Sequence, residues 1–343
     1  MNVSKEDLTA CYKIIKEGSH SFFSASKLLP KYVRDPAIVL YAFCRIADDT
    51  VDSVNGETDP IRSLKIRLFD AYSGSPRDNA IDRAFAQLVN NSRMPIELPL
   101  ALLEGLEWDT LGIRFETLSD LHAYSARVAS AVGVMMCVLM KVRDKDVLAR
   151  ACDLGAAMQL TNIARDIGED ARNGRIYIPL QWMAEEELNE RLFLNNPKHC
   201  PKVARLAQRL LIEADRLYLR AEAGLSCLPL KCRPGIFAAK HIYDKIGKHI
   251  AASNYDSISK RAYTSKVEKV AYLALSVANT ATVSLMPKSA MVHAAPLKEM
   301  EFLIHAACEK SEKEGYIARK AGKVITILEE LERRDRGLLS ALE

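Results

Sequence analysis

The sequence lacks the marks of a secreted or nucleic-acid-binding protein. Its first residues show no basic segment followed by an apolar one, so we expect no signal peptide. The formal net charge of +4 is small for 343 residues, so we expect no nucleic-acid partner. The eight cysteines include no CxxC pair, which indicates buried thiols in a reducing cytoplasm. No GxGxxG-type dinucleotide-binding motif occurs.

Glycine and proline are also scarce, with 15 and 13 residues, whereas alanine, leucine, arginine, lysine and glutamate are plentiful. This composition predicts an all-α protein. Apolar residues make up 49% of the chain, enough for a large core. No internal composition shift marks a domain boundary, so we expect the helices to form a single-domain bundle.

Two acidic motifs stand out from this helical background. The first candidate reads QLTNIARDIGED and places Gln159, Asn162, Asp166 and Asp170 at steps of three and four residues. On a helix these steps keep the side chains on one face. The preceding residues from Ala151 onward are mostly small and apolar, so the helix is predicted to be buried and to end in a polar stripe.

The same spacing occurs earlier in the chain, in YAFCRIADDTVD, where Asp48 and Asp52 follow an apolar run and Arg45 lies one turn before them. A lone acid pair on a helix is most often a solvated face. Two pairs that each end an apolar helix indicate more, because buried carboxylates repel unless a cation lies between them. Oxygen ligands alone favour Mg²⁺, with Mn²⁺ as the other candidate, over zinc.

These motifs, together with the longer segment NIARDIGEDARNGRIYIP, resemble the squalene/phytoene synthase family, and its phytoene-forming members match best. The resemblance runs from about residue 19 to about residue 269. It implies an isoprenoid synthase-type helical bundle around a central apolar cavity. We accordingly assign residues 1–287 to an isoprenoid synthase domain and residues 288–343 to a helical C-terminal extension.

The resemblance also implies a reaction. Family members join two prenyl diphosphates head to head, and the expected activity is the Mg²⁺-dependent conversion of two geranylgeranyl diphosphates to 15-cis-phytoene through prephytoene diphosphate, without NADPH. Two alternatives stay open. One is squalene or dehydrosqualene formation from farnesyl diphosphate. The other is a non-catalytic relative that serves as an assembly factor, against which the four retained aspartates argue.

The resemblance assigns site residues by position. The catalytic candidates are Arg45, Tyr124, Asn162 and Arg165. The metal-ligand candidates are Asp48, Asp52, Asn162, Asp166 and Asp170. The substrate-binding candidates are Ser21, Phe22, Tyr41, Arg45, Val132, Met136, Gln159, Tyr243 and Arg261. Where the family often has His and Lys around its first Ser, this chain has Gly18 and His20, so no side chain at position 18 contacts diphosphate.

Two further helices bear on the site. Residues 117–140 are predicted to form one helix, with Ser119 as its N-cap. Val132, Met135, Met136 and Leu139 on it form an apolar wall suited either to a prenyl chain or to an ordinary core. Residues 95–109 end in acids, and we expect Glu104 and Asp109 to lie on a solvated face rather than at the metal.

The C-terminal part leaves the question of membranes open. Residues 270–287 carry no charge, which predicts a buried or interfacial helix rather than a membrane span, because several Ser, Thr and Asn residues interrupt it. In the tail, Val324, Ile327, Leu328 and Leu331 form an apolar stripe that could dock on the body, a second copy or a membrane surface. We expect a cytoplasmic protein, with peripheral membrane association and contact with other carotenoid-pathway enzymes left open.

Overall fold

In a computed structural model, the described residues are 3–52, 59–285 and 289–308, and they contain helices but no strands. The chain divides into two compact units, Met1–Ala307 and Cys308–Glu343. Of the second unit only Cys308 is described, so the predicted apolar stripe of the tail lies outside the described residues. The sequence-based boundary after residue 287 stays a prediction.

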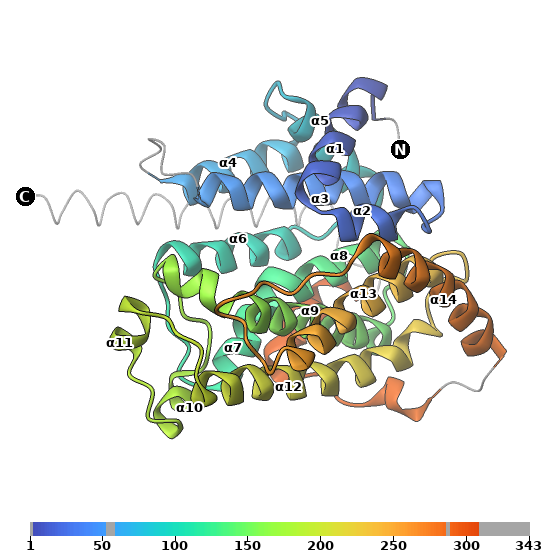
Figure 1. The fold of residues 1–343 in the computed structure, drawn as a ribbon. Coiled ribbons are helices and arrows are strands. Elements are labelled where there is room, and N and C mark those ends of the chain that lie inside the picture. The colour runs from blue at the N-terminus through green and yellow to red at the C-terminus, as the bar shows by residue number, and fades with distance from the viewer. Residues whose placement is uncertain (1–2, 53–58, 286–288, 309–343) are drawn as a thin grey trace, which may run out of the picture. The chain divides into compact units, whose positions relative to one another are not determined.

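The N-terminal half of the unit Met1–Ala307 begins with a group of helices that pack on one another. It continues with helices that lead to the long helix at the centre of the unit (Figure 1). Its elements are α1 (Lys5–Gly18), α2 (His20–Ser26), α3 (Lys31–Asp52), α4 (Pro60–Ser73), α5 (Ala80–Ser92), α6 (Glu97–Thr110), α7 (Leu118–Ser125), the π-helical turn η1 (Ala126–Ser130) and α8 (Ala131–Leu139). Contacts of α1 with α3 and α5, and of α5 with α3 and α4, hold the first group together.

The second half is organised around the long helix α9 (Lys145–Arg172), which packs against α12 above all and also against α8, α13 and η1. The remaining elements are α10 (Leu180–Glu185), α11 (Glu190–Asn195), α12 (Pro201–Leu225), α13 (Arg233–Ala252), α14 (Lys266–Leu285), the 3-10 turns η2 (Ala290–His293) and η3 (Lys298–Met300), and α15 (Glu301–Ala307). Both η2 and α15 contact α9.

Small residues let α9 lie close to its neighbours. A Cβ atom at Gly155 would lie 2.6 Å from the Cα of Ser130, and one at Gly133 would lie 2.8 Å from the carbonyl oxygen of Ala151. The hydroxyl of Ser130 donates to the carbonyl of Cys152 at 2.8 Å. These close approaches fix the η1–α8 segment against the middle of α9.

The helix predicted over residues 117–140 differs from the observed one in two ways. Thr117, not Ser119, is the N-cap: its hydroxyl accepts from the Asp120 amide, and the Asp120 carboxylate accepts from the Thr117 amide in return. This capping box satisfies two amides at once, which explains why the helix begins there. A π-helical turn then separates α7 from α8.

The stretch Leu118–Leu139 is apolar and long enough to cross a membrane, but 61% of its apolar window is buried inside the protein.

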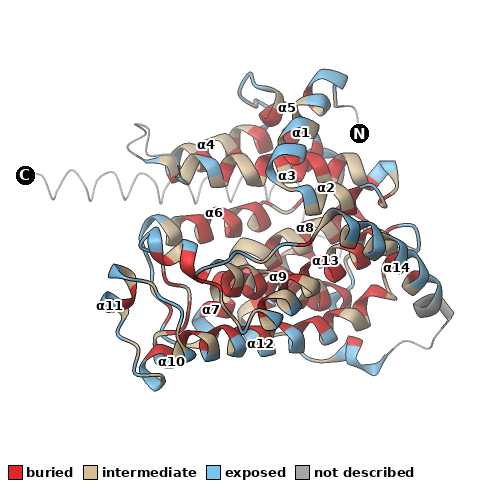
Figure 2. Cartoon of the chain, in the orientation of Figure 1, coloured by how far each residue is buried: buried red, intermediate tan, exposed pale blue. Residues whose placement is uncertain are grey.

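Helix α14 is not the fully buried helix that the sequence allowed. Ser276 and Thr280 are buried, while Val267 and Val270 are 79% and 67% exposed. The helix packs on α13, and its outer side faces away from the core (Figure 2). Its exposed apolar side chains among the described residues include Val267, Val270, Leu275 and Val277.

Candidate active site

The two acidic motifs end helices that meet at one place. Asp48 and Asp52 lie in the last turns of α3, and Asp166 and Asp170 lie in the last turns of α9. Arg175, just beyond α9, connects the two ends, because its Nη2 lies 2.7 Å from Oδ1 of Asp52.

Arginines neutralise part of this acidic surface. Arg45 contacts Asp49 at 2.7 Å and Asp48 at 3.6 Å within α3. Arg165 donates two hydrogen bonds to Asp166, at 2.8 and 2.5 Å. Several of the predicted metal ligands are therefore paired with guanidinium groups.

Arg261 reaches the second motif from a loop. It contacts Asp166 at 2.9 Å and Glu169 at 3.2 Å. Gly168 allows this, since a Cβ atom there would lie 2.7 Å from the Cα of Ile258, and the Gly168 amide donates to the Ser257 carbonyl at 3.0 Å. The loop that carries Arg261 thus crosses α9 at a glycine.

Asp109, at the end of α6, is a further acid beside the two motifs, and the expectation that it lies on a solvated face was wrong. It accepts hydrogen bonds from the hydroxyls of Tyr124 and Tyr177, at 2.9 and 2.8 Å. Burial raises the pKa of Asp109 to about 6, against the opposing effect of these two hydroxyls. The side chain of Glu104, expected on the same face, is 44% exposed and pairs with Arg127 at 2.9 Å.

Sequence reasoning gave Tyr177 no role. Its hydroxyl contacts Asp109, and its ring stacks on that of Tyr124 with centroids 5.1 Å apart. Periodicity gave no signal for Tyr177, because it lies in the loop after α9. Asp109 did carry a signal, since it ends an apolar helix just as both acidic motifs do.

The carboxylates of the site are short of compensating charge. Burial, followed by the neighbouring Asp52, raises the pKa of Asp48. Burial, followed by Asp166, raises the pKa of Asp170 to about 7. A cation placed among these groups would favour their ionised forms and offset the repulsion between them.

The donor set fits Mg²⁺. The side-chain oxygen of Asn162, one turn before Asp166, is buried without a hydrogen-bond partner in the part of the chain that the structure describes. A hard cation that prefers oxygen would satisfy this amide oxygen and the carboxylates together. Among the described residues no three Asp, Glu, His or Cys side chains already stand close enough to hold an ion. Arginines pair with Asp48, Asp52 and Asp166 instead.

Next to these acids lies an apolar cavity of about 330 Å³. Helix α9 contributes Leu154 and Met158 to its wall and then Gln159 and Asn162 toward the acids. The cavity is also lined by five other residues that were predicted to bind substrate: Phe22, Tyr41, Val132, Met136 and Tyr243. Ser21, Arg45, Tyr124, Arg165 and Arg261 are not among its lining residues.

Three aromatic rings lie together at the wall. The ring centroid of Phe22 is 6.1 Å from that of Tyr41 and 5.5 Å from that of Tyr243. Burial raises the pKa of Tyr41 to about 12, so its hydroxyl stays protonated at neutral pH. Gly18 leaves room for this hydroxyl, since a Cβ atom at position 18 would lie 2.6 Å from it.

Two of the four residues in the apolar wall predicted on residues 132–139 line the cavity. Val132 and Met136 line the cavity, together with Ala129 and Gly133. Met135 and Leu139 are buried on another side of α8 and do not line it. The helix turns about 100° per residue, so neighbours in sequence face different partners.

Comparisons with known proteins agree with this arrangement. The squalene/phytoene synthase family profile matches residues 15–268. A phytoene synthase of Cereibacter sphaeroides is 50% identical, covering 97% of this chain and 96% of that protein. A phytoene synthase of Rhodobacter capsulatus is 49% identical, covering 98% of this chain and 99% of that protein.

A solved structure extends the likeness to three dimensions. The crystal structure of a dehydrosqualene synthase in complex with a ligand is 30% identical and superposes with a TM-score of 0.74, covering 81% of this chain and 98% of that one. The all-α isoprenoid synthase fold predicted from the sequence is thereby confirmed. The chain belongs to the squalene/phytoene synthase family.

Proposed function

We propose that this protein is a prenyltransferase that joins two geranylgeranyl diphosphates head to head, through prephytoene diphosphate, to form 15-cis-phytoene for carotenoid biosynthesis. The proposal rests on an apolar cavity whose lining reaches Cys44 of α3 and Asn162 of α9, each one helical turn before an aspartate of the two acidic motifs. The two relatives that are about half identical to this chain and bear the name phytoene synthase support the same activity.

The acidic motifs would serve the diphosphate. Asp48, Asp52, Asn162, Asp166 and Asp170 would hold Mg²⁺, or Mn²⁺ in its place. When bound, the ion supplies positive charge to the diphosphate and makes it a better leaving group.

The arginines beside the carboxylates would bind the diphosphate itself. Arg45, Arg165 and Arg261 each donate to an aspartate now, and guanidinium groups bind phosphate oxygens with the same geometry. Their positive charges would stabilise the negative charge that develops as the C–O bond breaks. Ser21 would also contact the substrate.

The cavity would protect the carbocation that remains. Its walls exclude water, which would otherwise quench the cation. The rings of Phe22, Tyr41 and Tyr243 present π faces that attract positive charge. Tyr124, whose hydroxyl donates to Asp109, would also help to stabilise this cation. The final proton loss requires no reductant, so we propose that NADPH is not used.

A second candidate is the formation of dehydrosqualene or squalene from farnesyl diphosphate. The likeness to a dehydrosqualene synthase structure supports it, because the same site could serve a shorter chain in a shallower cavity. A non-catalytic assembly role has less support, since the aspartates of both motifs are present and Arg175, just beyond the second motif, contacts Asp52 of the first.

We further propose a cytoplasmic location with peripheral attachment to a membrane. A prenyl diphosphate is amphiphilic and the product is a hydrocarbon, so both partition into lipid. The exposed apolar side chains of α14 supply a surface for such attachment. Other carotenoid-pathway enzymes would be the natural neighbours there.

A product assay tests the proposed function. The purified protein is incubated with Mg²⁺ and either geranylgeranyl or farnesyl diphosphate, with and without NADPH, and the extracted hydrocarbons are identified by mass. We expect a forty-carbon product that forms equally well without NADPH. A thirty-carbon product alone would favour the second candidate, and no product from folded protein would contradict both.

A further inference from the structure

The apolar cavity ends at a charged residue. Arg150 lines it although only 1% of the residue is exposed to solvent. It lies on α9, twelve residues before Asn162, and a helix rises about 1.5 Å per residue, so the two positions are separated by about 18 Å along the helix. Arg150 therefore lies at the end of the cavity that is remote from the acidic motifs.

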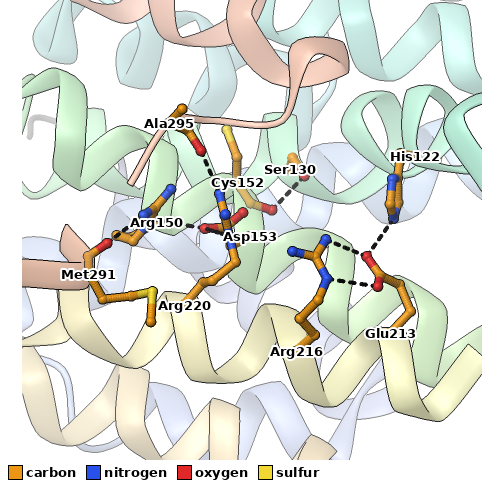
Figure 3. Close-up of polar contacts among 10 residues, drawn as sticks. All are labelled: His122, Ser130, Arg150, Cys152, Asp153, Glu213, Arg216, Arg220, Met291 and Ala295. Carbon is orange, nitrogen blue, oxygen red and sulfur yellow. Dashed lines mark hydrogen bonds and ion pairs between the residues drawn. The ribbon is translucent and has the colours of Figure 1, made fainter. Parts of the chain in front are cut away.

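A network of charges holds this arginine in place (Figure 3). Its Nη1 donates to the Met291 carbonyl at 2.7 Å, and its Nε lies 2.8 Å from Oδ2 of Asp153. Arg220 of α12 donates to the same Asp153 oxygen at 3.1 Å and to the Ala295 carbonyl at 2.7 Å. One buried carboxylate thus joins two arginines, and both arginines hold the segment 291–295 behind the cavity.

Stability alone does not explain this network. Burial lowers the pKa of Arg150 and raises the pKa of Asp153, which means that both charges lose solvation. In the described part of the chain, the Nη2 of Arg150 has no hydrogen-bond partner. Buried ion networks of this kind often contribute less stability than apolar side chains of the same volume would. A role in fixing position is the better explanation.

Gly224 of α12 determines where the arginine stem lies. A Cβ atom at Gly224 would lie 2.4 Å from Cβ and 2.8 Å from Cγ of Arg150, and both residues line the cavity. The stem therefore fills the space that a side chain at position 224 would need. An added methyl group there would have to move α12 away from α9 at this point and displace the stem toward the cavity.

We propose that Arg150, fixed by Asp153 and Arg220, forms the end wall of the cavity and sets the longest prenyl chain that the enzyme accepts. This inference rests on the proposed function. A methionine at this end would yield to a longer chain, because its thioether side chain is flexible. An arginine held by an ion pair and a carbonyl does not move aside in this way. It therefore sets a fixed upper limit on the length of the prenyl chain.

The test compares kcat/KM for the fifteen-, twenty- and twenty-five-carbon prenyl diphosphates. Arg150→Ala opens the end of the cavity, while Arg220 still neutralises Asp153. We expect the twenty-five-carbon substrate to gain at least tenfold relative to the twenty-carbon one. Gly224→Ala acts in the opposite direction, and we expect the fifteen-carbon substrate to gain at least fivefold relative to the twenty-carbon one.

A second charge cluster on α12 provides the matched control (Figure 3). Glu213 contacts His122 at 3.1 Å and Arg216 at 2.6 Å, and none of these three residues lines the cavity. Glu213→Gln should lower the melting temperature and leave the substrate ratios within twofold of the unaltered protein.

The outcomes separate the two proposals. If the unaltered protein makes no hydrocarbon, the proposed function is wrong. If it is active and the folded variants keep its ratios within twofold, the end-wall inference is wrong. Should Arg150→Ala fail to fold, the ratio measured for Gly224→Ala decides alone.

Discussion

At the scale of single residues, burial governs the acidity of the site. Asp109 has a pKa of about 6 because the protein around it replaces water, even though two tyrosine hydroxyls donate to it. An aspartate whose pKa is raised on folding binds more protons in the folded than in the unfolded protein between about pH 4 and pH 6. Its contribution to stability is therefore complete below pH 4 and is lost as the pH rises toward 6.

Asp109→Asn removes this contribution. In metal-free protein we expect the free energy of unfolding of the variant to fall less steeply between pH 4 and pH 6 than that of the unaltered protein. Denaturant titrations at several pH values measure this slope. Asp78→Asn is the control, because the Asp78 side chain is 99% exposed. Equal slopes for Asp109→Asn and the unaltered protein would contradict the assignment.

The sequence predicted which residues lie at the polar end of α9 but not what covers Asp109. Gln159, Asn162, Asp166 and Asp170 share a helix face, and a face follows from spacing alone. Tyr124 and Tyr177 reach Asp109 from positions 15 and 68 residues away in the sequence. Spacing along one helix contains no information about such partners.

At the scale of elements, helix α8 offers a direct test of the cavity wall. Val132 and Met136 line the cavity, whereas the adjacent Met135 is fully buried elsewhere. Val132→Phe fills the cavity and should favour farnesyl over geranylgeranyl diphosphate by about tenfold, while Met136→Ala should shift the ratio the other way. Ratios of kcat/KM measure both effects.

Met135→Leu is the matched control for this wall, because it changes the shape of a neighbouring side chain that does not line the cavity and nearly conserves its volume. It should leave the substrate ratio unchanged. An unchanged ratio in Val132→Phe and Met136→Ala as well would place the prenyl chain in another part of the protein.

The crossing of α9 by the Arg261 loop depends on Gly168. Gly168→Ala places a methyl group against the backbone of Ile258, so we expect a loss of about 1–3 kcal/mol in stability. Displacement of Arg261 should also lower kcat by about tenfold or more. Thermal unfolding and steady-state kinetics measure the two effects.

Gly247→Ala on α13 is the control, because its added Cβ would meet only the flexible end of Leu211 at 3.3 Å. A helical Gly→Ala change of this kind is neutral or stabilising by up to about 1 kcal/mol. If both glycine variants behave alike, the close approach at Gly168 does not position Arg261.

The bounds of the amphipathic helices follow well from the sequence, since burial of one face is what makes them helical. The break in the helix within residues 118–139 does not follow from the sequence. Its π-helical turn lies where Gly155 and the Cys152 carbonyl of α9 contact Ser130, so tertiary packing accompanies this change of period. The N-cap at Thr117 was missed because two candidate caps, Thr117 and Ser119, stand two residues apart.

At the scale of the whole molecule, the exposed apolar side of α14 predicts attachment to lipid. Liposomes should carry the protein upward in a flotation gradient, and Val270→Glu with Val277→Glu should reduce the floated fraction several-fold, because charge does not enter the apolar layer. Ile212→Glu, a change at a 61% exposed residue of α12, is the control. Equal flotation of all three proteins would exclude α14 as the attachment surface.

The composition was enough to predict an all-α protein, and the family resemblance carried by the two acidic motifs predicted the isoprenoid synthase-type bundle around a cavity. The end of that cavity was not predictable. Arg150, Asp153 and Arg220 come together with the segment 291–295 only through the packing of α9, α12 and η2. In sequence they are ordinary charged residues.

The two acidic motifs are proposed to form one Mg²⁺-dependent site for the diphosphate. Calorimetric titration with an unreactive thiolo analogue of geranylgeranyl diphosphate tests it in the presence and absence of Mg²⁺. We predict Mg²⁺-dependent binding that Asp48→Asn and Asp166→Asn each weaken at least tenfold, or about 1.4 kcal/mol. If either variant, folded by circular dichroism, binds the analogue as tightly as the unaltered protein does, the two motifs do not share one site.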